Sequence, residues 1–151
     1  MVTIQYRPRR KTRAVILHDS HTGPEVTNTL EHLRVQGRQK GLLDVGYHVV
    51  IERGGTQHMT RPLDVMGSHL PGNNFDTIGV CLAGNEETGV TEEQMASLFC
   101  LMVGHEETAG LPLLGHYEIP RSGTRRSGCK CPCLDMNKLR YKLFGRETPQ
   151  P

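Results

Sequence analysis

Two short apolar runs constrain the fold of this chain more than any other feature. Residues 14–17 read AVIL and residues 77–83 read TIGVCLA. Continuous apolar runs of about four to eight residues, bounded by polar or turn residues, indicate strands that are buried within a sheet. A shorter apolar stretch at 111–114 ends at Gly115 and His116. These patterns therefore predict a sheet that is covered by other elements.

A β-hairpin is expected over residues 47–59. The segment combines alternating apolar residues with a turn at Gly54 and Gly55, which is typical of a hairpin. With a period of two, Tyr47, Val49 and Ile51 would share one face of the first strand, and His48 would point away.

Helical patterns separate these strands. Pro24 precedes apolar residues at helical spacing that end near Gly41, and Thr91 and Gln94 form a capping box before a second apolar stripe. That stripe consists of Met95, Leu98, Phe99, Met102 and Val103. A closing helix is marked by Met136, Leu139 and Leu143. The predicted fold class is α/β: a single domain over residues 1–151, with a central mixed β-sheet flanked by helices.

Composition excludes several classes of protein. A chain of 151 residues with 36% hydrophobic residues can bury a core and is not a disordered protein. The net charge of +2 gives no field for nucleic acid, and the basic run at residues 7–11 is interpreted as solvated surface. No apolar stretch approaches the ~20 residues that span a bilayer. The N-terminal residues lack the layout of a secretory signal, so we expect synthesis in a cytoplasm and no membrane partner.

The cysteines are concentrated near the end of the chain, where residues 129–133 read CKCPC. Five cysteines, an odd number, in a reducing compartment argue against a disulfide scaffold. The chain holds no CxxC pair for redox chemistry and no second close pair for a zinc knuckle. The leading interpretation is one working cysteine, Cys131, with Cys129 and Cys133 as bystanders.

Two histidines follow apolar strands, at His18 and His116, and Cys131 is expected at the start of the closing helix. A catalytic zinc site uses three nitrogen, sulfur or oxygen ligands and leaves the fourth position open. A helix N-terminus and Lys130 would both favour the Cys131 thiolate. Spacing alone does not select this trio, since the chain has eight histidines.

Several stretches together carry a family resemblance that covers nearly the whole chain. They are residues 15–18, 43–51, 66–69, 78–84 and 115–118, with Asn73, Thr91, Gln94, Cys131 and Pro132. This combination resembles the zinc-dependent N-acetylmuramoyl-L-alanine amidases, a family that also includes the peptidoglycan-recognition proteins. The most similar type is the small single-domain lysozyme, or endolysin, of podophages.

The resemblance implies a set of site residues. His18, His116 and Cys131 match the zinc ligands, for one Zn²⁺ per chain, and Tyr47 matches the catalytic tyrosine. In the phage enzymes a catalytic lysine precedes the ligand cysteine by two positions. Here that position holds Cys129, so the role is assigned to Lys130, one residue later.

The substrate implied by the resemblance is bacterial peptidoglycan, cut between N-acetylmuramic acid and the L-alanine of the stem peptide. Ser68, His69 and Asn73 fall in the part of the chain that corresponds to the substrate groove. The protein is then expected to be a monomeric endolysin that is made in the host cytoplasm and reaches the wall after the membrane has been permeabilised.

Two other roles stay open. Some relatives bind peptidoglycan without cutting it, and these generally lack the ligand cysteine that Cys131 matches here. Some podophage relatives also inhibit the RNA polymerase of their phage, and no feature of this sequence decides whether this chain does so.

Overall fold

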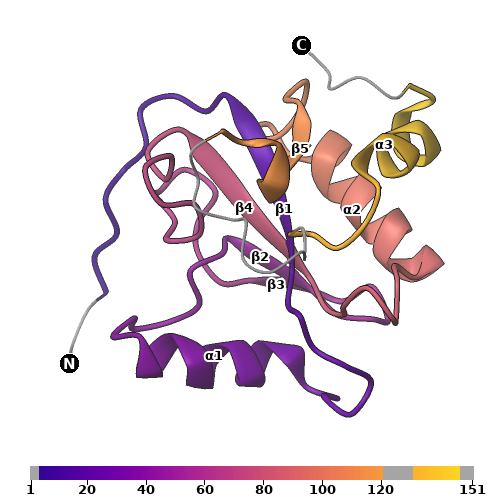
Figure 1. Cartoon of the computed structure of the whole chain (residues 1–151). Coiled ribbons are helices and arrows are strands. Elements are labelled where there is room, and N and C mark those ends of the chain that lie inside the picture. The colour runs from indigo at the N-terminus through magenta and orange to yellow at the C-terminus, as the bar shows by residue number, and fades with distance from the viewer. Residues whose placement is uncertain (1–3, 121–130, 147–151) are drawn as a thin grey trace.

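A five-stranded mixed sheet forms the centre of the computed structural model, which describes residues 4–120 and 131–146 (Figure 1). The strand order is β3-β2-β4-β1-β5, with β2 and β3 antiparallel and the other neighbours parallel. The elements in chain order are β1 (Ala14–Asp19), α1 (Thr29–Gln39), β2 (Val49–Ile51), β3 (Gln57–Met59), β4 (Thr77–Leu82), α2 (Glu92–Gly104), β5 (Leu113–Gly115), the 3₁₀ helix η1 (His116–Glu118) and α3 (Met136–Phe144). The predicted α/β class is confirmed.

The two longest strands, β1 and β4, are buried along their whole length. Because successive side chains in a strand point to opposite faces, β1 contributes to two separate cores. Val15 and Leu17 belong to the core under α2 and α3, whereas Ala14 and Ile16 belong to a second core on the opposite face. His18 has the same parity as Ile16, so β1 delivers it to that second face.

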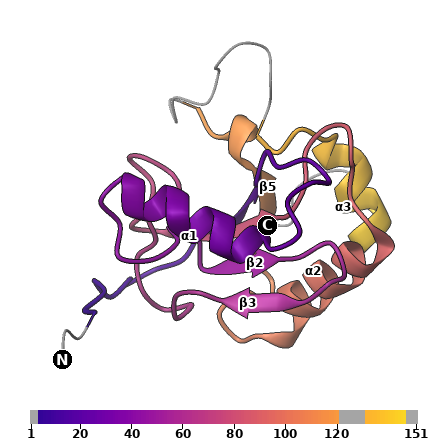
Figure 2. The ribbon, with the colours of Figure 1, turned by 90° about the horizontal axis from the view of Figure 1, so that it is seen from below.

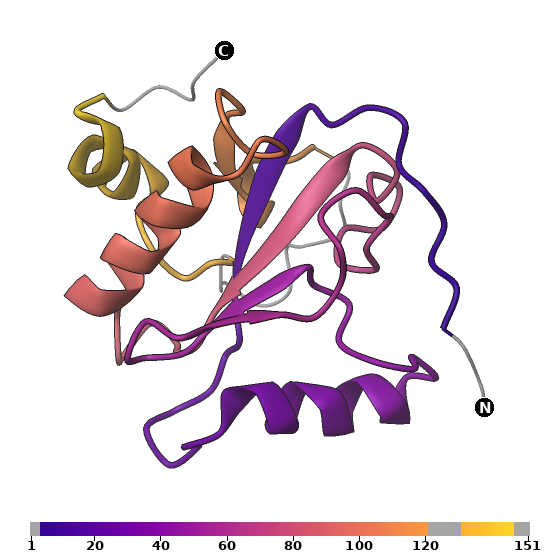
Figure 3. The ribbon, with the colours of Figure 1, turned by 180° about the vertical axis from the view of Figure 1, so that it is seen from behind.

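Helices α2 and α3 cover the first face together (Figure 3). The predicted capping box is present: Thr91 Oγ1 accepts from Gln94 N, and Gln94 Oε1 accepts from Thr91 N. The predicted apolar stripe is partly wrong. Phe99 and Val103 are 41% and 54% exposed, while Leu101 is fully buried, so α2 is rotated relative to that stripe.

Helix α1 lies on the other face, across from α2 and α3, and passes in front of the sheet near β2 in Figure 2. It begins at Thr29, later than Pro24, because Asn28 caps it by accepting a hydrogen bond from Glu31 N. Leu33 packs with Val50 and with the buried thiol of Cys81.

The hairpin of β2 and β3 forms as predicted, but Tyr47 is not part of it. β2 begins at Val49, after a bend, and the strand alternation does not extend back to Tyr47. Tyr47 therefore packs with Val50 on the α1 face, whereas Val49 and Ile51 face the α2 core. The prediction that Tyr47, Val49 and Ile51 share a face is wrong for this reason.

No helix within residues 4–120 and 131–146 combines the length and apolar character needed to cross a bilayer.

Candidate metal centre

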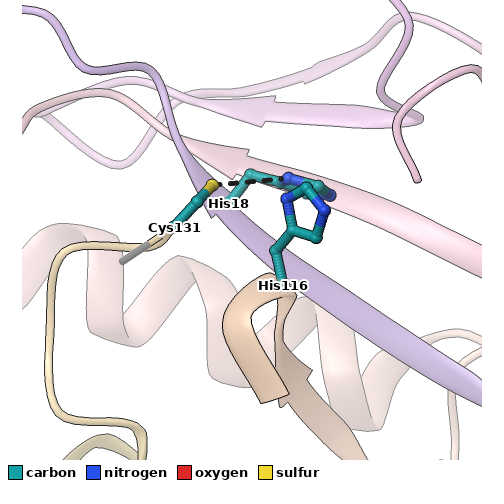
Figure 4. A group of neighbouring side chains, drawn as sticks. All are labelled: His18, His116 and Cys131. Carbon is teal, nitrogen blue, oxygen red and sulfur yellow. Dashed lines mark hydrogen bonds between the residues drawn. The ribbon is translucent and has the colours of Figure 1, made fainter. Parts of the chain in front are cut away.

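Three side chains from distant parts of the chain meet on the α1 face of the sheet (Figure 4). His18 comes from β1, His116 is the first residue of η1, directly after β5, and Cys131 lies in the segment before α3. β5 pairs with β1 in parallel, so both histidines are delivered to the same end of neighbouring strands. The structure thus brings together all three residues predicted as metal ligands.

The spacing of the three donor atoms suits one small metal ion. A ring nitrogen from each histidine and the Cys131 sulfur lie within 4.8 Å of one another. His18 Nδ1 is 3.6 Å from Cys131 Sγ. Nitrogen and sulfur ligands of a tetrahedral zinc ion, at about 2.1 Å and 2.3 Å from the metal, are themselves about 3.6 Å apart. The donor set and its spacing therefore fit zinc.

Burial keeps His18 in the neutral form that binds metals. Its side chain is 2% exposed, and burial lowers its pKa well below the ordinary value, with further lowering from the nearby rings of His69 and His116. A neutral imidazole retains one nitrogen lone pair for a metal.

Tyr47 stands beside this group, with its ring centroid 5.0 Å from that of His18. Burial raises the pKa of the Tyr47 phenol well above its ordinary value, and the neighbouring Cys81 and Cys131 raise it further. At neutral pH the phenol therefore keeps its proton and can donate a hydrogen bond.

A cavity of about 250 Å³ opens next to Tyr47 and extends along α1. Ser68, one of the predicted groove residues, lines this cavity, and Lys40 of α1 adds a positive charge. His69 and Asn73 are not among its lining residues. His69 is 7% exposed and lies against His18, whereas the Asn73 amide oxygen accepts from Arg13 Nη2 at 2.9 Å.

A carboxylate that the sequence analysis missed lies at the end of β1. Asp19 is 6% exposed; its Oδ2 accepts from Cys133 N at 2.7 Å, and its Oδ1 is 2.8 Å from His21 Nδ1. The hydrogen bond with Asp19 is the main factor that raises the pKa of His21 to about 10. Asp19 thus links β1 to residues 131–133, which we call the cysteine segment. The sequence signal that could have identified Asp19 is its position directly after His18, at the end of a buried strand.

The cysteine segment differs from expectation in two respects. Cys131 does not begin the closing helix, since α3 starts at Met136 with Asp135 as its N-cap, so the helix terminus does not act directly on the thiol. Cys133 is disulfide-bonded, while Cys131 is free. An odd number of thiols excludes complete pairing but allows a single bridge. Asp19, His21 and Cys133 also cluster, but a disulfide sulfur is not the thiolate that a metal site requires.

Lys130, the predicted catalytic lysine, and Cys129 both lie outside the described residues.

A partly buried ion pair holds the segment that carries His116. The Glu118 carboxylate accepts from Arg140 Nη1 and Nη2, both at 2.8 Å, and from Gly115 N at 2.8 Å. Arg140 of α3 is 1% exposed. Burial raises the pKa of Glu118, but the hydrogen bonds from Arg140 and Gly115 outweigh it and lower the pKa below its ordinary value. We call this group the Glu118–Arg140 clamp.

Solved structures of similar fold are amidases and peptidoglycan-recognition proteins. N-acetylmuramoyl-L-alanine amidase LysC from Clostridium intestinale superposes with a TM-score of 0.69 over 94% of each chain at 24% identity. Bumblebee PGRP-SA gives a TM-score of 0.76 at 18% identity and covers 100% of this chain and 93% of its own. The fold is therefore that of the amidase and peptidoglycan-recognition class.

Sequence comparison then gives the family. The N-acetylmuramoyl-L-alanine amidase family matches residues 8–132. The endolysin of Klebsiella phage KP32 is 31% identical over 145 residues, and that of Escherichia phage T7 is 32% identical over 145 residues; each match covers 91% of both chains. The chain belongs to the N-acetylmuramoyl-L-alanine amidase family and has phage endolysins among its relatives.

Proposed function

We propose that this protein is a zinc-dependent endolysin that hydrolyses the amide bond between N-acetylmuramic acid and L-alanine in bacterial peptidoglycan. The observation that carries the proposal is the meeting of His18, His116 and Cys131, with donor atoms within 4.8 Å of one another, beside Tyr47 and the cavity along α1. Family membership supports the amide-bond chemistry.

In this proposal, His18 Nδ1, His116 and Cys131 Sγ would hold the zinc ion. The chemistry that zinc supplies at such a site is polarisation of a carbonyl and activation of water near pH 7.

Tyr47 supplies the second part of the mechanism. Its phenol stays protonated because partial burial raises its pKa, so it could donate to the carbonyl oxygen as negative charge develops there. Such a donor would stabilise the charge that develops on the oxygen. The cavity beside Tyr47 would receive the stem peptide, with Ser68 at its wall.

Digestion of purified peptidoglycan, with and without a chelator, tests the proposal. We expect new L-alanine amino termini, no new reducing sugar ends, and loss of activity when the chelator is present. Reducing ends in place of amino termini would identify a glycosidase. Zinc binding without any release would identify a binding module instead.

The ligand assignment is tested by Cys131→Ser, with Cys100→Ser as the matched control because Cys100 is a free and exposed cysteine. We expect Cys131→Ser to lose zinc and activity while Cys100→Ser keeps both. Full activity and one equivalent of zinc in Cys131→Ser would show that Cys131 is not a ligand.

The proposed site of action is the cell wall, reached from the host cytoplasm after the membrane has been opened. Bacteria that express the protein should lyse when chloroform is added and not before. Inhibition of an RNA polymerase stays open, and a transcription assay with the polymerase of the same phage would decide it.

A further inference from the structure

His69 lies behind His18, on the ring nitrogen that faces away from Cys131. His18 Nδ1 is directed at Cys131 Sγ, while His18 Nε2 is 2.9 Å from His69 Nδ1. The second contact is buried, and it joins residues 51 positions apart in the sequence. Each nitrogen of the His18 ring therefore has a separate partner.

The hydrogen bonds of Thr77 determine which ring nitrogen of His69, and then of His18, carries the proton. Thr77 Oγ1 donates to the Asn73 carbonyl at 2.6 Å, which uses its only proton. Towards His69 Nε2, 3.3 Å away, this hydroxyl can only accept. His69 Nε2 therefore carries the ring proton, and Nδ1 of the neutral ring is an acceptor. His18 Nε2–H donates to it, which leaves the lone pair on His18 Nδ1.

The fold leaves little freedom for the His69 ring. A Cβ on Gly79 would lie 2.4 Å from His69 Cγ, and a Cβ on Gly67 would lie 2.7 Å from its Cδ2. Asn74 Oδ1 accepts from the backbone N of His69 at 2.9 Å and from that of Leu70 at 2.8 Å. Two glycines and one capping side chain thus fix the ring in place.

We propose that His69 is a positioning residue that fixes the tautomer and the orientation of His18, so that His18 Nδ1 is presented to the metal. This inference rests on the zinc centre proposed above. It gives His69 a task other than contact with substrate, because the ring is buried behind the ligand and does not line the cavity. Partners on the second nitrogen of a ligand histidine set its tautomer and its basicity.

Zinc affinity, measured by competition with a chromophoric chelator, is the first test. We expect His69→Leu to weaken affinity by about 10- to 100-fold, the usual loss when such a partner is removed. His69→Asn should retain most of the affinity, since its amide oxygen can accept near the position of Nδ1. Thr77→Val should weaken affinity and Thr77→Ser should not, because only serine keeps the hydroxyl.

His48 provides the matched control. It is a fully buried histidine packed against His69, with ring centroids 5.8 Å apart, but its nitrogens bond to Gly79 N and the Val65 carbonyl. His48→Gln should lower the unfolding temperature without changing zinc affinity. A folded His69→Leu protein with wild-type zinc affinity would refute the positioning role.

The second test uses the metal-free protein and needs no activity. Long-range ¹H–¹⁵N NMR spectra should show both His18 and His69 protonated at Nε2, and the Thr77→Val variant should change the His69 signals. A His18 ring protonated at Nδ1 would overturn the inference. A wild-type protein that binds no zinc would overturn the proposed function and this inference together, whereas tight zinc binding by both wild type and His69→Leu would overturn the inference alone.

Discussion

Removing one partner of the Glu118–Arg140 clamp should destabilise the fold more than any exposed ion pair does. Arg140 donates two 2.8 Å hydrogen bonds to the Glu118 carboxylate, one to Asn137 Oδ1 at 2.7 Å and one to the Leu113 carbonyl at 3.2 Å. Truncation of one member of a buried ion pair costs about 3–5 kcal/mol, because the other charge stays buried.

The exposure of the two partners and the group that is removed set how large the loss should be for each variant. The Arg140 side chain is 2% exposed, but Glu118 is 24% exposed and can be partly hydrated when Arg140 is lost. We therefore expect Arg140→Met to cost about 3 kcal/mol, at the low end of the range. Glu118→Gln keeps the shape and one acceptor oxygen, and should cost about 2 kcal/mol, the value of one charged hydrogen bond.

Urea unfolding at pH 7 measures these free energies. The double variant should cost about 3 kcal/mol, less than the sum of the single variants, because the two residues act as one unit. The matched control is Arg38→Met, which removes the ion pair between Arg38 and Glu31. These side chains are 56% and 53% exposed, so the change should cost about 0.5 kcal/mol or less. Additive losses in the double variant, or a loss at Arg140 no larger than at Arg38, would refute the reasoning.

Four further predictions concern the clamp, the candidate site and the α2 cap. The stability contribution of Glu118, whose pKa is lower in the folded state, should be fully present above its unfolded pKa of about 4.3 and be lost as the pH falls through the folded value; urea titrations at pH 3–7 on wild type and Glu118→Gln should converge at the acid end. Tyr47→Phe should lower kcat on peptidoglycan by about 100- to 1,000-fold with unchanged zinc affinity, and an equal loss of zinc would contradict its role as a donor. Gly79→Ala, whose Cβ would lie 2.4 Å from the His69 ring, should cost about 1–3 kcal/mol, whereas Gly104→Ala, with open space, should be neutral or stabilising in thermal unfolding. Thr91→Ala should cost about 1 kcal/mol through loss of the α2 cap, and Thr91→Ser should restore it.

Local patterns in the sequence were sufficient for the main elements of the fold. Apolar runs located β1 and β4, and the capping box located the start of α2, because each signal depends on residues close together in the chain. The patterns failed where a tertiary contact decided the result. The bend before β2 moved Tyr47 to the other face of the sheet, and packing against the core left Phe99 exposed.

For the candidate site, too, the sequence identified some residues and misplaced or missed others. The sequence, through its family resemblance, selected His18, His116 and Cys131 from a chain with eight histidines and five cysteines. It placed His69 in the substrate groove, and it missed Asp19 altogether.

The sequence by itself thus determined which strands form, because strand patterns are properties of local residues, and its family resemblance selected the candidate metal ligands. Only the tertiary structure decided which nitrogen of His18 faces Cys131, that His69 stands behind it, and that Asp19 joins β1 to the cysteine segment. These are contacts between residues far apart in the sequence, and their direction depends on where each ring and carboxylate lies once the sheet has formed.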